Sequence, residues 1–157
     1  SAHNETLKRV NRAHTVEQFD RAFDRLRAAG LKITVHLIFG LPGESFDDIM
    51  RTVEYIAAKQ PEGVKIHNLN IAEGTPLAKE YAAGEISVPS GQRHLDYVIE
   101  ALQRLPKDTV VQRVTCDTSS DRLIAPQYFT PKSQFYQQLD QKMAEQKVYQ
   151  GCKSFYG

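Results

Sequence analysis

The sequence predicts an α/β domain built from parallel strand–helix repeats. A near-continuous apolar run, residues 33–39, and a second predicted strand, residues 64–71, are separated by a single amphipathic segment. An apolar run without alternation is typical of a strand covered on both faces, and the spacing of the two strands indicates a right-handed βαβ crossover. Both strands end in glycine turns, at Gly40 and Gly74, which we expect to lie at one edge of the sheet.

The first amphipathic helix is predicted between Thr15 and Gly30. Thr15 and Gln18 have the spacing of a capping box, and the glycine is a typical helix stop. The apolar stripe of this helix consists of Val16, Phe19, Phe23 and Leu26.

Ser45 is predicted to cap the helix between the two strands, with Asp47 and Asp48 in its first turn, where the helix dipole favours negative charge. Glu44 precedes this cap, and we favour that simple position over a role as an acid at the sheet edge. The inner stripe of the helix is expected to be Phe46, Ile49, Val53 and Ile56.

A short helix over 77–83 is followed by a longer one that Ser90 caps and Leu105-Pro106 ends, because proline cannot continue a helix. The inward residues of the longer helix are Leu95, Val98, Ile99 and Leu102. Residues 110–115 predict a third strand.

Residues 117–130 have no clear periodicity and are predicted to be a loop. Pro131 then precedes a polar helix with few apolar residues. We interpret this helix as a cap rather than core, with contacts through Phe135, Leu139 and Met143.

The composition indicates one ordinary domain of 157 residues, 41% of them hydrophobic. Its formal charge of +1 does not indicate binding to nucleic acid, a membrane or an acidic substrate. No apolar run approaches the ~20 residues of a membrane span, so no membrane partner is expected. Cys116 and Cys152 lack the spacing of a metal site or a disulfide framework. We therefore predict reduced thiols and a cytoplasmic protein.

The predicted strand–helix units are too few to close a barrel, which needs eight strands and roughly 250 residues. The sequence opens on Ser1 and a polar stretch, 2–11, with no earlier element to pack against. We therefore expect a part of a larger barrel rather than an open sheet. Its bare edge strand predicts a homodimer or a strand-swapped dimer.

Three ordered segments, 1–14, 35–44 and 67–77, resemble the second half of a radical SAM enzyme. The chain is similar to the YhcC-like family, whose relatives include elongator-type proteins and coproporphyrinogen dehydrogenase. The resemblance implies that residues 1–105 form the C-terminal half of a partial (β/α)6 TIM-like barrel and that 106–157 form a C-terminal extension or helical cap.

The same resemblance implies that the partner of this segment is the N-terminal half of its own barrel. That half would carry a CxxxCxxC loop for a 4Fe-4S cluster, a metal centre absent from this chain. The cluster and S-adenosylmethionine together supply a 5'-deoxyadenosyl radical, as in related oxidoreductases. This segment alone is expected to be inactive.

The resemblance also implies cofactor-binding residues. Arg12 falls where relatives hold an arginine that would suit the methionine carboxylate, although a solvated arginine is the alternative. His36 replaces an acid of coproporphyrinogen dehydrogenase and could bond a ribose hydroxyl or be a core histidine. Ile38 and Gly40 match positions that flank adenine, although sheet packing and turn geometry also explain them.

Leu69 and Asn70 occupy the place where relatives offer backbone to adenine. Because Asn68 and Asn70 alternate with apolar residues, both amides are expected on one face inside the barrel, where a ligand or water would satisfy them. His67 and His94 have no neighbouring carboxylate or cysteine at ligand spacing, so we predict no metal site there.

An RNA- or protein-interaction module without catalysis is the alternative function. Basic residues alternate with aromatic ones as in single-strand readers, although acids interleave: Lys107, Arg113, Arg122 and Lys132, with Tyr128 and Phe129. Elongator-type and methylthiolating relatives act on tRNA, so tRNA is also a candidate substrate of the enzyme. A free nucleotide binder using 40–45 is disfavoured, because the loop lacks the P-loop lysine.

Overall fold

The computed structural model describes residues 1–116 and 121–156 and confirms the α/β class. Its helices are α1 (Asn4–Arg9), α2 (Val16–Ala28), α3 (Phe46–Ala58), α4 (Pro76–Ala82), α5 (Gly91–Arg104) and α6 (Lys132–Gln146). Its strands are β1 (Thr34–Phe39), β2 (Gly63–Asn68), β3 (Ile71–Ala72), β4 (Val110–Arg113) and β5 (Leu123–Ala125).

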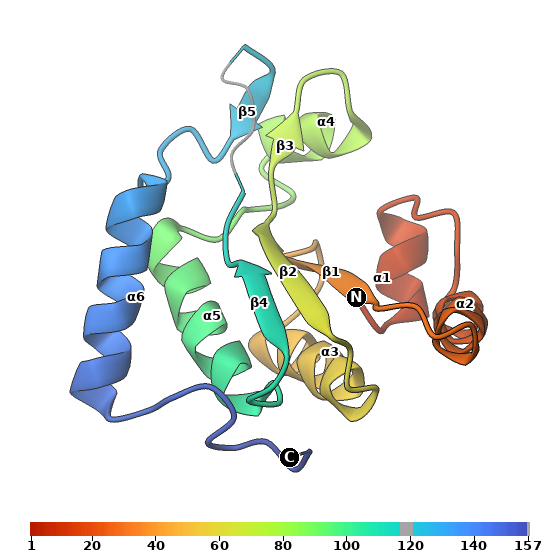
Figure 1. Cartoon of the computed structure of the whole chain (residues 1–157). Coiled ribbons are helices and arrows are strands. Elements are labelled where there is room, and N and C mark those ends of the chain that lie inside the picture. Colours follow the sequence, from red (N-terminus) through yellow and green to blue (C-terminus); the bar gives the residue numbers. More distant parts are fainter. Residues whose placement is uncertain (117–120, 157) are drawn as a thin grey trace.

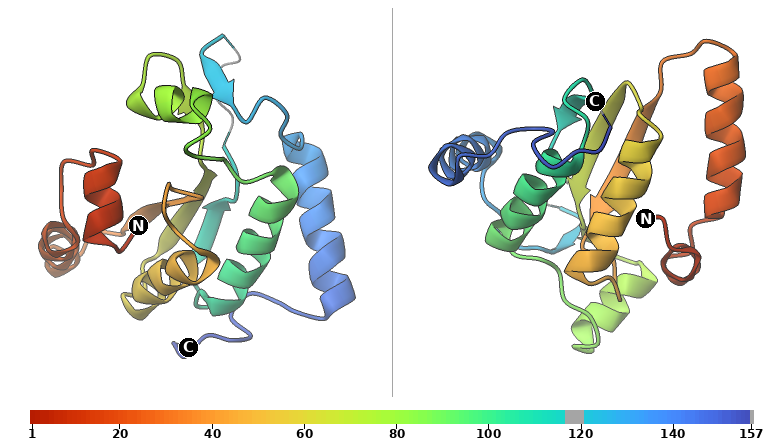
Figure 2. Two further views of the ribbon diagram at one scale, coloured as in Figure 1. Left: turned by 180° about the vertical axis from the view of Figure 1, so that it is seen from behind. Right: turned by 90° about the horizontal axis from the view of Figure 1, so that it is seen from below.

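The main sheet is three-stranded and parallel, in the order β1-β2-β4 (Figure 1). Helices α3 and α5 cover one face, and α6 lies against α5 on the outside (Figure 2). We call the other face of the sheet, turned away from α3 and α5, the open face. The described residues form no closed barrel.

Burial alternates along β1, which differs from the predicted strand covered on both faces. Val35, Leu37 and Phe39 are buried in the core, whereas His36 and Ile38 are exposed. The apolar run is continuous in sequence, but helices cover only one face of the sheet in the described part of the chain.

The predicted helix caps are confirmed. Thr15 and Ser45 each form a capping box, with Gln18 and Asp48 respectively, and Ser90 accepts a bond from the N–H of Arg93 at the start of α5. These signals lie within a single turn, so local sequence is sufficient to specify them.

Helix α2 forms as predicted, but its apolar stripe is only partly covered. Phe23 is its only buried residue, and Leu26 is 42% exposed. The helix stands beside the edge of β1 (Figure 1), and no strand of the described chain fills the space beneath it.

The polar start of the chain packs against a later element of the fold. Leu7 of α1 is 6% exposed. His3 Nε2 lies 2.9 Å from the carbonyl oxygen of Asp48, and the N–H of Ala2 donates to Thr52 Oγ1 at 3.0 Å. The start of the chain is therefore tied to α3.

The predicted strand 64–71 is divided into two strands, β2 and β3, and the predicted loop 117–130 contains strand β5. β2 ends at Asn68, and β3 pairs antiparallel with β5, with Ile71 opposite Ala125. Their apolar side chains form a small second cluster with Leu41 and Leu69. Local periodicity missed this pairing because the partners are distant in sequence; 117–120 lie outside the described residues.

Helix α6 makes the predicted contacts, and two of them belong to the core itself. Phe135 is 0% exposed and Leu139 is 5% exposed, both within the main cluster, and Met143 packs against its edge. Whether residues 106–157 form a separate unit stays a prediction.

His94 of α5 is a buried neutral side chain. It is 0% exposed and lies among the rings of Phe39, Phe129 and Phe135. Its Nε2 lies 2.8 Å from the carbonyl oxygen of Val114, which identifies this nitrogen as the donor. Burial lowers the pKa of His94 to about 4.

We expect His94 to destabilise the fold in acid. Because its pKa in the folded state lies below 6.5, the unfolded chain binds the proton first, so stability is complete above that value and falls as pH drops toward 4. The loss between about pH 7 and about pH 5 should be roughly 2 kcal/mol in the free energy of unfolding.

Urea unfolding at both pH values checks this expectation. His94→Leu should remove that part of the pH dependence, whereas the control His14→Leu, on a half-buried loop residue, should keep it. Identical pH dependence in wild type and His94→Leu would contradict a neutral buried imidazole.

Candidate functional site

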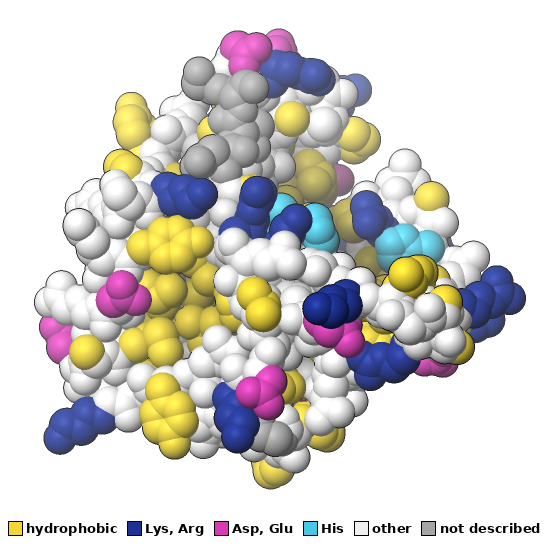
Figure 3. Space-filling view, in the orientation of Figure 1, with side chains coloured by type: hydrophobic (Ala, Val, Ile, Leu, Met, Phe, Trp, Pro, Cys, Tyr) yellow, Lys and Arg dark blue, Asp and Glu magenta, His cyan; other side chains and the backbone are white. Residues whose placement is uncertain are grey.

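The open face carries polar and basic side chains from all three strands, and Figure 3 shows lysine, arginine and histidine gathered over the sheet. Strand register places His36 beside Lys65 and Ile38 beside His67. Arg113 of β4 lies beside Lys65. His36 and Ile38, two of the predicted cofactor contacts, lie on this face.

His36 and His67 stack on one another, with ring centroids 5.3 Å apart and an angle of 21° between the ring planes. Partial desolvation by its neighbours, followed by the charges of Lys65, Arg113 and Arg12, holds the pKa of His36 below its ordinary value. Burial and the neighbouring cations also lower the pKa of His67. Both rings are therefore neutral near pH 7, so each can donate one hydrogen bond and accept one.

Arg12, His36 and Ile38 lie on one cavity. They line, with His67, one end of a cavity of about 500 Å³ between the N-terminal helices and β1. The Arg12 side chain is exposed and has no hydrogen bond or ion pair within the described residues. His36 is exposed, so the alternative of a core histidine is wrong.

The other end of the same cavity is apolar. It runs between α2 and the edge of β1 that pairs with no strand of the described chain. Its lining includes Phe19, Phe23, Leu26 and Ile33. The cavity thus has a polar end on the open face and an apolar end beneath α2.

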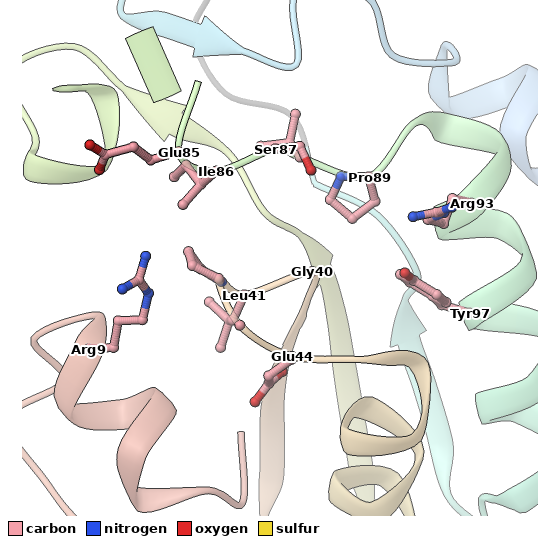
Figure 4. A pocket seen from close by; sticks show the side chains of 13 residues that line it. Arg9, Gly40, Leu41, Glu44, Glu85, Ile86, Ser87, Pro89, Arg93 and Tyr97 are labelled. Carbon is pink, nitrogen blue, oxygen red and sulfur yellow. The ribbon is translucent and has the colours of Figure 1, made fainter. Parts of the chain in front are cut away.

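Gly40 lies at the carboxyl end of β1, on a separate polar pocket of about 440 Å³ (Figure 4). Its φ of +88° suits glycine, and a Cβ there would lie 2.5 Å from Pro89 Cδ. Leu41 lines both this pocket and the cavity of Arg12, so the two are adjacent. Glu44, on the same pocket, directly precedes the Ser45 cap as expected.

Leu69 and Asn70 line neither cavity. Leu69 donates its N–H to the carbonyl of Phe39 at 3.1 Å, and its side chain is buried in the second cluster. The Asn70 side chain accepts from Asn68 Nδ2 at 2.8 Å and donates to Cys116 Sγ at 3.5 Å.

The two asparagines are satisfied by protein groups, which corrects the expectation of a ligand or water. Asn68 Oδ1 accepts from Thr115 Oγ1 at 2.9 Å and from the N–H of Cys116 at 3.0 Å. Asn68 is 4% exposed, on the core side of β2. These bonds join the end of β2 to the segment after β4.

The two aromatic residues of the set proposed for RNA differ in exposure. Phe129 packs against His94 at 5.7 Å and Phe135 at 6.0 Å between ring centroids, whereas Tyr128 is 92% exposed. Arg113 lies on the open face. Phe129 is half-buried, so only part of its ring is accessible.

Over residues 1–116 and 121–156, no group of three or more His, Cys, Asp or Glu side chains could hold a metal ion. Cys116 and Cys152 are not in a disulfide. No helix in these ranges is both long enough and apolar enough to cross a membrane.

Sequence reasoning missed Lys65 and His67 as partners of the candidate residues. Their signal was present, because Thr34, His36 and Ile38 alternate with buried residues, and Lys65 and His67 do the same on β2. Treating the first strand as covered on both faces hid its alternation.

Two family matches cover most of the chain. Residues 61–145 match the Radical SAM C-terminal domain, and residues 1–56 match the Radical SAM superfamily. Bacillus subtilis YtqA is 29% identical over 151 residues, covering 96% of this chain and 47% of the relative. Escherichia coli YhcC is 30% identical over 151 residues, covering 94% and 48%. The chain thus spans about half the length of these curated relatives.

Other matches bear names that refer to tRNA or to Elongator. A tRNA uridine(34) acetyltransferase of Methanocaldococcus infernus is 30% identical over 120 residues, covering 74% of this chain and 22% of the relative. The solved archaeal Elp3 of M. infernus, with an N-terminal deletion, superimposes with a TM-score of 0.85 at 24% identity, covering 96% of this chain and 35% of that chain. This likeness establishes the fold.

Proposed function

Because the chain belongs to a radical SAM family of the YhcC type, we propose that its full-length protein binds S-adenosylmethionine and that this segment forms one wall of the binding cavity. When bound together, the cofactor and a 4Fe-4S cluster supply a 5'-deoxyadenosyl radical. The observation that carries the proposal is the convergence of Arg12, His36 and Ile38 on one cavity of a radical SAM fold.

The residues on this wall suit the cofactor chemically. The guanidinium of Arg12 has no partner within the described residues, and its planar fork can bind a carboxylate through two bonds. Neutral His36 can donate to a ribose hydroxyl, and Ile38, 41% exposed, offers apolar surface to a base. Gly40 keeps the end of β1 free of a side chain at the neighbouring rim.

The cluster does not fit this segment, because the described residues contain no set of metal ligands. We therefore assign its ligands to the N-terminal half of the barrel. The N-terminal half could cover the apolar end of the cavity. One of its strands could pair with the edge of β1 that has no partner in the described chain and cover the exposed stripe of α2. In the segment alone, the same edge suits a second copy of the chain.

We propose tRNA as the substrate. Support comes from relatives whose names refer to tRNA, a tRNA uridine(34) acetyltransferase and a tRNA-2-methylthio-N(6)-dimethylallyladenosine synthase. The second of these is 26% identical over 143 residues. The cytoplasmic location expected from the sequence accords with such a substrate.

Anaerobic reconstitution of the full-length protein with iron and sulfide tests the proposed activity. With a reductant and S-adenosylmethionine, we expect 5'-deoxyadenosine, measured by chromatography, and more of it when bulk tRNA is added. A protein that shows the visible absorption of a cluster but forms no 5'-deoxyadenosine would overturn the proposal.

Arg12→Ala should weaken binding of S-adenosylmethionine to the reconstituted full-length protein by about tenfold or more, because a charge-assisted pair contributes about 1.5–3 kcal/mol. Isothermal titration measures the affinity. Arg12→Lys should give an intermediate value, since it keeps the charge and loses the fork.

The matched control is Arg21→Ala, at an exposed position of α2. It should bind the cofactor like the wild type. An unchanged affinity in Arg12→Ala would make Arg12 an ordinary solvated arginine.

A further inference from the structure

Two half-buried cations lie side by side on the open face without counter-ions. Lys65 and Arg113 are register partners on β2 and β4. Neither side chain has an ion pair or a hydrogen bond within the described residues, whereas the other half-buried basic residues there, Lys59, Arg104 and Lys142, are paired with carboxylates. Two positive charges on neighbouring strands repel one another, and an anion bound between them would replace this repulsion with attraction.

A β-bulge creates this arrangement. Val64 faces Val111, but the next residue of β2, Lys65, faces Arg113, so Gln112 is the extra residue of β4. Two neighbouring residues of β4 therefore share the open face. Gln112 Nε2 donates to Thr34 Oγ1 there at 2.9 Å, and Arg113 lies close enough to both histidines to lower their pKa values. Regular alternation would have turned Arg113 toward the core.

The stacked histidines complete the surroundings of the two cations. The charged groups that act on His36 and His67 are all basic: Lys65, Arg113 and, for His36, Arg12. His67 Nε2 is buried and has no hydrogen-bond partner within the described residues. The site thus offers two fixed positive charges and an unused imidazole nitrogen.

We propose that Lys65 and Arg113 bind an anionic group of the substrate, a phosphate or a carboxylate, with His67 as the neighbouring hydrogen-bonding group. Charge complementarity selects this occupant over an apolar one. The inference rests on the proposed function, since it assigns the open face to the substrate. It adjoins the cofactor contact, which we place on Arg12, because His67 also lines the cavity of Arg12.

Anion binding to the chain can be measured at low ionic strength by NMR of the histidine imidazoles. We expect inorganic pyrophosphate to shift the signals of His36 and His67 and to raise their pKa values, because the anion offsets the cations. Succinate in a parallel titration distinguishes a carboxylate site from a phosphate site; the tighter of the two identifies the group. Failure of both anions to shift these signals would overturn the proposal.

Lys65→Gln and Arg113→Gln should each weaken binding about tenfold, whereas Lys132→Gln, at the exposed start of α6, should leave it unchanged. Neither test variant loses a partner, so their thermal midpoints should not fall. Equal weakening in all three variants would mean nonspecific attraction and would contradict the site.

The same titration in the full-length protein decides between a ligand and an internal partner. Persistence of binding there supports a substrate site. Loss of binding would show that acidic residues of the N-terminal half occupy Lys65 and Arg113, and would overturn the proposal. Formation of 5'-deoxyadenosine without substrate is a separate readout, so failure of the radical chemistry is distinguishable from failure of this site.

Discussion

Gly40→Ala is expected to lower the free energy of unfolding by about 4 kcal/mol, roughly half from a strained backbone and half from overpacking. The φ of Gly40 is +88°, a conformation that alanine rarely adopts. The new Cβ would lie 2.5 Å from Cδ of Pro89, a ring atom that cannot rotate away. Urea unfolding followed by circular dichroism measures the loss.

Gly43→Ala is the matched control. Gly43 has the same φ of +88°, but no atom lies within 4 Å of the position of its Cβ. This variant should therefore show only the backbone part, about 2 kcal/mol. Equal losses in the two variants would mean that β1 does not pack against the segment before α5 at Pro89.

Phe135→Ala is expected to cost about 4 kcal/mol, the range for removing a fully buried aromatic ring. Phe135 is 0% exposed, with its ring centroid 6.0 Å from that of Phe129 and 5.6 Å from that of His94. The residual cavity would lie between α5 and α6. The thermal midpoint and the urea midpoint should both fall.

Tyr128→Ala supplies the comparison, because Tyr128 is an aromatic residue of the same region that is 92% exposed. A surface substitution of this kind should change stability by less than about 0.5 kcal/mol. If the two variants behave alike, α6 is not part of the core.

Local signals in the sequence predicted the helices well. The capping boxes at Thr15 and Ser45 fixed two helix starts, and the spacing of Phe135, Leu139 and Met143 identified the inward side of α6. These signals act within one or two turns. The pairing of β3 with β5 depends on residues far apart in sequence, so no local window contained it.

The structure places Arg12, His36 and Ile38 on one cavity, with Arg12 in the loop before α2 and the other two on β1. Their binding of a cofactor stays a prediction. The side-chain partners of Asn70 could not be predicted, because they include Cys116, which reaches Asn70 only through the fold. Lys65 was overlooked because its importance depends on which sheet face lacks a helix.

Because of the bulge at Gln112, the number of residues in β4 matters more than their identity for which side chains become buried. One extra residue determines to which face of the sheet each following side chain points, so Val114 reaches the interior only because β4 contains Gln112. Many amino acids could occupy position 112. Deleting this residue, however, would turn the buried side chains that follow it toward the open face and the exposed ones toward the core. Among related proteins, the number of residues between positions 111 and 114 should therefore be conserved more strongly than the amino acid at position 112.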